Sequence, residues 1–174
     1  MKRTLYWAAV ALQLGTLIVM AASRELRLAS SRTVVLATVP VDPRDLFRGD
    51  YVQLRYRIST VPTPSDATFT PGETVWIPLH PAGDVWEAGE PTDVPSDEGG
   101  PYIMGRVTSA AGGVLRVEYG IEQYFVPEGR GRAIERLPHD TLRVEVALDD
   151  AGRPAIRRLV VDGQPVDFTK PPNG

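Results

Sequence analysis

Beyond Arg24, hydrophobic and polar residues alternate with a period of two, and no period of 3.6 residues persists for more than a turn or two. The alternation is clearest in residues 52–58, 115–119 and 142–148, where every second side chain is apolar. Strands with one buried face and one solvated face have this pattern, which is typical of antiparallel sheets. The stretch 33–39 is apolar on both faces, which predicts a more central strand.

Weaker patterns and turn residues predict the remaining strands and their connections. Four further candidate strands are residues 74–79, 102–107, 121–126 and 156–161. Glycine-containing turns are expected to join strands at residues 111–113, 149–152 and 162–163. The sequence therefore predicts an all-β domain over residues 24–174, built as a small antiparallel sandwich or a barrel-like fold.

The N-terminal part of the chain has a different character. Residues 4–23 are 20 consecutive residues without a charge, and a helix of that length matches a hydrocarbon core of roughly 30 Å. Lys2 and Arg3 precede this run, and basic residues favour the cytoplasmic side. We therefore expect a single transmembrane helix in the inner (cytoplasmic) membrane, with residues 1–3 inside the cell and residues 24–174 in the periplasm or outside.

A cleaved signal peptide is the alternative interpretation of this segment. The triplets Val19-Met20-Ala21 and Met20-Ala21-Ala22 place small residues near a possible cleavage site. The apolar stretch 5–22 is, however, longer than the roughly 7–15 residues of a signal-peptide core, which favours an uncleaved anchor. Both interpretations put the rest of the chain in the same compartment.

Composition excludes several classes of protein. Hydrophobic residues make up 43% of the chain, which is enough material for a core and excludes wholesale disorder. The formal net charge of −3 makes a general nucleic-acid binder an unlikely class, so no nucleic-acid partner is expected. Cysteine is absent, which excludes disulfides, cysteine-based zinc sites and cysteine nucleophiles. Residues 61–72, with three prolines, and residues 87–101, with five acidic residues, are expected to be exposed loops.

Residues 40–51 carry the densest local information. Asp42 can cap a helical turn, and Pro43 falls at the first helical position, where its missing N–H costs nothing. Asp45 follows where a carboxylate favours the positive helix end, and Gly49 can adopt the left-handed conformation that ends the turn. These residues predict one capped helical turn that leads into the strand beginning at Tyr51.

Four charged residues of this loop are not explained by the turn alone. They are Arg44, Asp45, Arg48 and Asp50. One interpretation is that their ion pairs brace the loop against the strand; the other is that they form a recognition surface. Both remain open from the sequence.

A motif begins in the same loop and continues into the strand. Gly49, Asp50, Tyr51, Leu54 and Tyr56 match the signature of the GDYXXLXY family of bacterial membrane-anchored proteins, which the chain resembles. Residues 40–48 resemble the lead-in to that motif, and residues 119–129 resemble a later family signature. The resemblance covers nearly the whole chain and implies a single-pass membrane protein. Family members often lie beside, or are fused to, multi-pass membrane proteins, and the resemblance implies no activity, cofactor or catalytic residue.

The two motifs can be divided between core and surface. Leu54 and Tyr56 share the apolar face of their strand, so we expect both in the core, with a partner for the Tyr56 hydroxyl. In the second motif, Ile121, Gln123 and Phe125 fall on one side and Glu122 and Tyr124 on the other, so that Glu122 and Tyr124 face outward if Ile121 and Phe125 face the core. The candidate binding residues are Arg44, Asp45, Arg48, Asp50, Tyr51, Glu122, Tyr124 and Glu128. This set requires the two motifs to meet in space.

No recognisable catalytic or metal-binding motif occurs in the sequence, so we expect neither an enzyme nor a cofactor. His80 and His139 lack the spacing of a metal-binding helix. Paired carboxylates are the remaining catalytic possibility, because glycoside cleavage needs only two carboxyl groups roughly 5–10 Å apart. Asp50 with Glu122 or Glu128 are the candidates for such a pair.

The leading functional hypothesis is an interaction module attached to the membrane. Residues 4–23 would contact lipid, and the two motifs would bind a multi-pass membrane protein or another envelope partner. A tether raises the effective concentration of the two partners, so that a weak interface suffices. The alternatives are a carboxylate-dependent hydrolase of envelope glycan and a small-ligand sensor with an apolar pocket between sheets.

Overall fold

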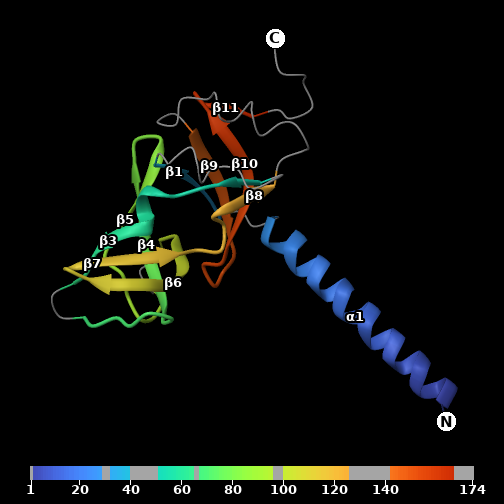
Figure 1. Ribbon diagram of the computed structural model, residues 1–174. Coiled ribbons are helices and arrows are strands. Elements are labelled where there is room, and N and C mark those ends of the chain that lie inside the picture. The colour runs from blue at the N-terminus through green and yellow to red at the C-terminus, as the bar shows by residue number, and fades with distance from the viewer. Residues whose placement is uncertain are drawn as a thin grey trace.

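A computed structural model describes residues 2–28, 32–39, 51–64, 67–95, 100–125 and 142–166. The chain has one long helix at its N-terminus and is otherwise mostly β-structure (Figure 1). The prediction of an all-β domain is confirmed at this level.

The helix, α1 (Lys2–Leu28), has 27 residues and extends away from the strands, with its C-terminal end close to β9 and β10 (Figure 1). Many of its described apolar side chains are exposed, including the four consecutive residues Leu17–Met20 at 56% to 68%. Judged by length and hydropathy together, no helix within the described residues qualifies to cross a membrane. The predicted helix is therefore confirmed, whereas its crossing of a membrane is not supported.

Nine strands form one sheet in the order β11-β10-β9-β1-β5-β4-β6-β7-β3. The strands are β1 (Arg32–Ala37), β3 (Thr60–Pro62), β4 (Thr74–Ala82), β5 (Val85–Ala88), β6 (Tyr102–Ala111), β7 (Val114–Glu118), β9 (Leu142–Leu148), β10 (Pro154–Val161) and β11 (Gln164–Pro165). All neighbours are antiparallel except β1 and β5. Two further strands, β2 (Tyr51–Gln53) and β8 (Gln123–Phe125), pair with each other.

Strand β4 connects the two halves of the sheet. Its first part, from Thr74 to Pro78, pairs with β6, and its last part, from Leu79 to Ala82, pairs with β5. The predicted central strand β1 lies between β9 and β5, as its apolar sequence requires. The predicted turns at residues 111–113, 149–152 and 162–163 each join consecutive strands.

The core consists of the apolar residues that alternation selects. Val34 and Leu36 of β1, Leu115 and Val117 of β7, and every second residue of β9 are buried. Leu54, Tyr56 and Ile58 are buried as well, although Arg57–Ser59 form a short 3₁₀ turn, η1, rather than a strand. The alternation therefore identified the buried face even where the strand is interrupted.

The two predicted loops are partly wrong. Residues 61–72 include buried Val61 and Phe69, and Thr63 N–H donates to the Gly113 carbonyl, 2.9 Å away. Glu87 and Ala88 belong to β5, and Thr92 pairs with Trp76 through two backbone hydrogen bonds of 2.9 Å. Short strands and isolated backbone pairings can include proline and acidic residues, so the loop prediction from composition alone failed in these segments.

Candidate functional site

The two motif segments meet in space. Strand β2, which begins at Tyr51, pairs with β8 of the second motif, and Val52 lies opposite Tyr124. One residue further, the Leu54 N–H donates to the Glu122 carbonyl at 2.7 Å. The spatial association that the set of candidate residues requires is present for these described parts of the motifs.

The same two segments pair a second time further along, where β3 meets β7. Thr60 lies opposite Arg116, and Pro62 lies opposite Val114. Between the two pairings lie residues 55–59 on one side and residues 117–121 on the other, five on each side, so the register is the same before and after the gap. The segments thus form one long two-stranded ribbon that is open in the middle.

Two tyrosines hold the open part together. The Tyr56 hydroxyl donates to the Ile121 carbonyl at 2.6 Å, and the Tyr119 hydroxyl donates to the Ile58 carbonyl at 2.5 Å. Each tyrosine thus reaches from its own segment to the backbone of the other. Their rings meet edge to face, with centroids 6.5 Å apart. We call this reciprocal pair the tyrosine clasp.

The electrostatics of the tyrosine clasp favour the neutral hydroxyls. Burial, and secondarily the negative charge of Glu122, raises the pKa of both Tyr56 and Tyr119 above the ordinary value for tyrosine. The hydroxyls consequently stay protonated and able to donate. Glu122 is itself held in place, since its Oε1 accepts the Tyr119 N–H at 2.6 Å.

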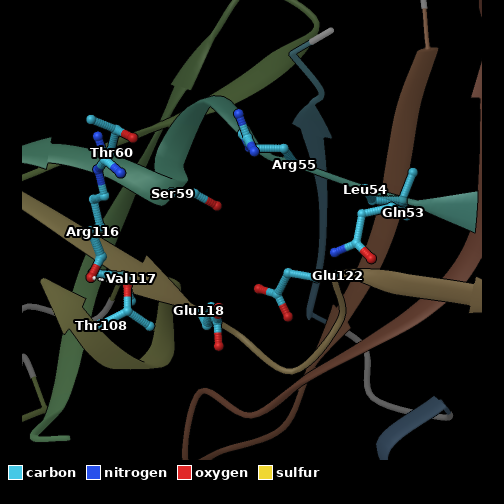
Figure 2. Close-up of a pocket in the computed structure, with 10 residues that line it drawn as sticks. All are labelled: Gln53, Leu54, Arg55, Ser59, Thr60, Thr108, Arg116, Val117, Glu118 and Glu122. Atoms are coloured by element: carbon cyan, nitrogen blue, oxygen red, sulfur yellow. Dashed lines mark hydrogen bonds between the residues drawn. The ribbon is translucent and has the colours of Figure 1, made fainter. Parts of the chain in front are cut away.

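A groove of about 360 Å³ lies where the ribbon opens. Figure 2 shows its lining residues, which come from both segments and from β6. They are Gln53, Leu54, Arg55, Ser59, Thr60, Thr108, Arg116, Val117, Glu118 and Glu122. Leu54 and Val117 are buried, whereas the other side chains are polar and at least partly exposed. The arginine side chains of Arg55 and Arg116 have no ion pair or hydrogen bond within the described residues.

Three departures from regular pairing surround the groove. The β6–β7 pairing has a bulge between Val107 and Ser109, and the bulged Thr108 donates its hydroxyl to the Arg116 carbonyl at 3.2 Å. The second departure is η1, and the third is Gly120, whose φ of +76° lies in the left-handed region. Bulges and unusual backbone conformations concentrate near functional sites, so their meeting at one place marks the groove as the candidate site.

Most of the predicted site residues of the first motif lie outside the described residues. These are Asp42, Pro43, Arg44, Asp45, Arg48, Gly49 and Asp50, together with Glu128 of the second motif. For Tyr51, the structure describes the backbone pairing with Phe125. The capped helical turn and the binding roles proposed for the charged residues of this loop therefore stay predictions.

The described motif residues divide between core and groove. Leu54 and Tyr56 are 3% and 1% exposed, which confirms the prediction that they belong to the core. The Ile121 carbonyl is the partner that the buried Tyr56 hydroxyl required. Glu122 lines the groove, in agreement with the expectation that it faces outward.

The predicted orientation of Phe125 and Tyr124 is wrong. Phe125 is 74% exposed, whereas Tyr124 is half-buried and packs against the core. Tyr124 lies opposite the buried Val52, so both point toward the core face of the ribbon. The inward-facing positions change from odd to even residue numbers between Ile121 and Tyr124, which the sequence pattern did not reveal.

Several groove residues were not singled out from the sequence. Arg55, Arg116 and Glu118 lie on the polar face of their alternating segments, where charged residues usually face solvent. The alternation of polar and apolar residues did not predict the bulge at Thr108. Within the described residues no group of three potential ligands is placed to hold a metal ion.

Comparison with known proteins identifies a family. The family model described as GDYXXLXY protein matches residues 13–159, which includes both motifs and the groove. No curated protein and no solved structure matches the chain significantly.

Proposed function

This chain belongs to the GDYXXLXY family, and we propose that it is a membrane-attached, extracytoplasmic accessory module that binds a membrane or envelope protein through its two joined motifs. The helix α1 is the attachment to lipid, and the groove in the ribbon is the central part of the binding surface. The β-domain is the scaffold that carries the groove.

The case for lipid contact depends on the run 4–23 and on its exposure. Four consecutive helical residues cover a full turn, so the exposed Leu17–Met20 present apolar surface on every side of α1. A protein partner that docks on a helix covers one side of it, whereas lipid surrounds a helix on all sides. Lipid therefore accounts better for this distribution than a single docking partner does.

The case for partner binding depends on one observation. Two motifs that lie more than 60 residues apart in sequence, at Tyr56 and Ile121, are joined around a polar groove by a side chain-to-backbone hydrogen bond. The open ribbon presents the guanidinium groups of Arg55 and Arg116 to solvent, ready to form ion pairs with another molecule.

Co-purification from native membranes tests the proposal. Arg55→Glu and Arg116→Glu, each solubilised in mild detergent as the full chain, are expected to lose a membrane or envelope protein that the unaltered chain retains. Arg153→Glu is the matched control, because Arg153 is also an exposed arginine but lies in the connection between β9 and β10. Equal retention by all three variants would contradict binding through the groove.

A second candidate function is favoured by the presence of two carboxylates in the groove. Glu118 and Glu122 both line it, and glycan hydrolysis requires two carboxyl groups. The hydrolase hypothesis predicts turnover of envelope glycan that is lost in both Glu118→Gln and Glu122→Gln. Absence of turnover by the unaltered chain would rule it out. The sensor hypothesis required an apolar pocket, and the polar lining of this groove does not favour it.

A further inference from the structure

The groove carries charged side chains of both signs. Arg116 and Glu118 lie toward the β3–β7 pairing. Arg55 and Glu122 lie toward the β2–β8 pairing, across the opening from each other (Figure 2). The register supports this placement, because Arg116 lies opposite Thr60 at one end and the Glu122 carbonyl binds Leu54 N–H at the other. Two positive and two negative groups give the groove no formal net charge.

Hydrogen-bonding groups without charge lie between and beside these four residues. Ser59, Thr60 and Thr108 supply hydroxyls, and Gln53 supplies an amide. The floor is apolar where Leu54 and Val117 are buried. A hydroxyl or an amide both donates and accepts hydrogen bonds, so these groups suit a ligand with a peptide backbone.

We propose that the groove binds an extended peptide segment of the partner in which acidic and basic side chains stand next to each other. This inference rests on the proposed function and names the chemistry of the partner. Each ligand charge then meets a groove charge of opposite sign, which gives specificity and excludes partners with a single sign.

Other ligand chemistries fit the groove less well. A phosphate-rich ligand would pair with Arg55 and Arg116 but would be repelled by Glu118 and Glu122. A polycation would pair with the two glutamates but would be repelled by the two arginines. An uncharged ligand would cover the two guanidinium groups without replacing their hydration, which is costly.

Three blocked hexapeptides test the proposal on the full chain in detergent. One alternates glutamate and lysine, one contains glutamate only, and one contains lysine only. By fluorescence anisotropy, the alternating peptide is expected to bind at least about tenfold more tightly than either of the others, and added salt should weaken its binding.

Variants then connect the preference with the groove. Arg116→Glu should abolish the preference for the alternating peptide, and Arg55→Glu serves as a second, independent variant in case the first lowers stability. Arg153→Glu should keep the preference, and thermal unfolding checks that all variants are folded. Equal binding of the three peptides overturns the inference, as does tightest binding of the glutamate-only peptide, which would indicate an anion site.

The outcome is separable from that of the proposed function. If co-purification of the partner depends on Arg55 and Arg116 while the alternating peptide shows no preference, the partner-binding function stands and the inferred peptide chemistry is wrong. If the peptide preference is present and no partner is retained, the groove chemistry stands and the accessory function is wrong.

Discussion

The two edges of strand β7 are used in different ways. Along one edge, β7 pairs with β6 in a hairpin that is closed by Gly112 and Gly113, with a single bulge. Along the other edge, β7 and the residues after it, up to Phe125, pair with residues 51–62 at both ends and are open in the middle. The hairpin depends on ladder hydrogen bonds, whereas the open part depends on the two hydroxyls of the tyrosine clasp. The family motif thus lies on the side of β7 where regular strand pairing is interrupted, and not on the side of the regular hairpin.

The largest effect is expected from removing one member of the tyrosine clasp. Tyr56 is 1% exposed, so Tyr56→Ala loses its buried ring and its hydrogen bond, and should lower the free energy of unfolding by about 3–5 kcal/mol. Val107→Ala, in the hairpin, removes a smaller buried side chain and should cost clearly less. Denaturant titration measures both. A larger loss of unfolding free energy for Val107→Ala than for Tyr56→Ala would contradict the importance given to the tyrosine clasp.

Alkaline pH should weaken the open ribbon more than the hairpin. The pKa values of Tyr56 and Tyr119 are raised in the folded state. Above about pH 10 the folded state therefore binds more protons than the unfolded state. Their contribution to stability is complete below that pH and falls by about 1.4 kcal/mol per pH unit for each tyrosine above it.

Unfolding free energies measured between pH 9 and pH 11 test this expectation. The matched control is the double variant Tyr56→Phe with Tyr119→Phe, which should lose most of this pH dependence. An unchanged slope in the double variant would show that other groups cause it.

A smaller effect is expected when only the hydroxyls are removed. Tyr56→Phe and Tyr119→Phe each leave a backbone carbonyl without its clasp donor, at about 1–2 kcal/mol apiece. Because the two rings also touch, the losses should not add, and a double-mutant cycle should give a measurable coupling. Tyr102→Phe is the control, since its hydroxyl binds the exposed Asp150 carbonyl, and it should cost less.

The smallest effect is expected at Gly120. Its φ of +76° disfavours a side chain, although a Cβ would meet no heavy atom within 4 Å. Gly120→Ala should therefore cost about 1 kcal/mol through backbone strain alone. A Cβ on Gly105 of the hairpin would collide with Val117, so Gly105→Ala should cost more. Similar losses of unfolding free energy at both positions would show that Gly120→Ala has a cost beyond backbone strain.

The sequence predicted the strands because burial on one face imposes alternation. Because the alternation continues through the open part of the ribbon, it gave no indication that the ribbon opens. Equal numbers of residues separate the two pairings on both sides, so Leu54, Tyr56 and Ile58 stay on the buried face throughout. Nothing in the alternation distinguishes a paired segment from an open one.

Other features depend on contacts that are distant in sequence. The parallel pairing of β1 with β5 and the short strand β5 itself were not predicted, because β5 has only four residues and an acidic residue among them. The arginines of the groove resemble any solvated face until the fold brings Arg55 and Arg116 to one place. The family resemblance identified the two motifs, but their pairing in space is a feature that the structure supplies.

Site-specific photo-crosslinking in intact membranes tests the central claim most directly. A photoreactive residue in place of the exposed Glu118 in the groove should give a crosslink to one partner protein, and Arg116→Glu in the same chain should remove it. The same photoreactive residue in place of Asp150, in the exposed turn after β9, should give no such product. A crosslink to the same protein from both positions, or one that persists with Arg116→Glu, would contradict binding through the groove.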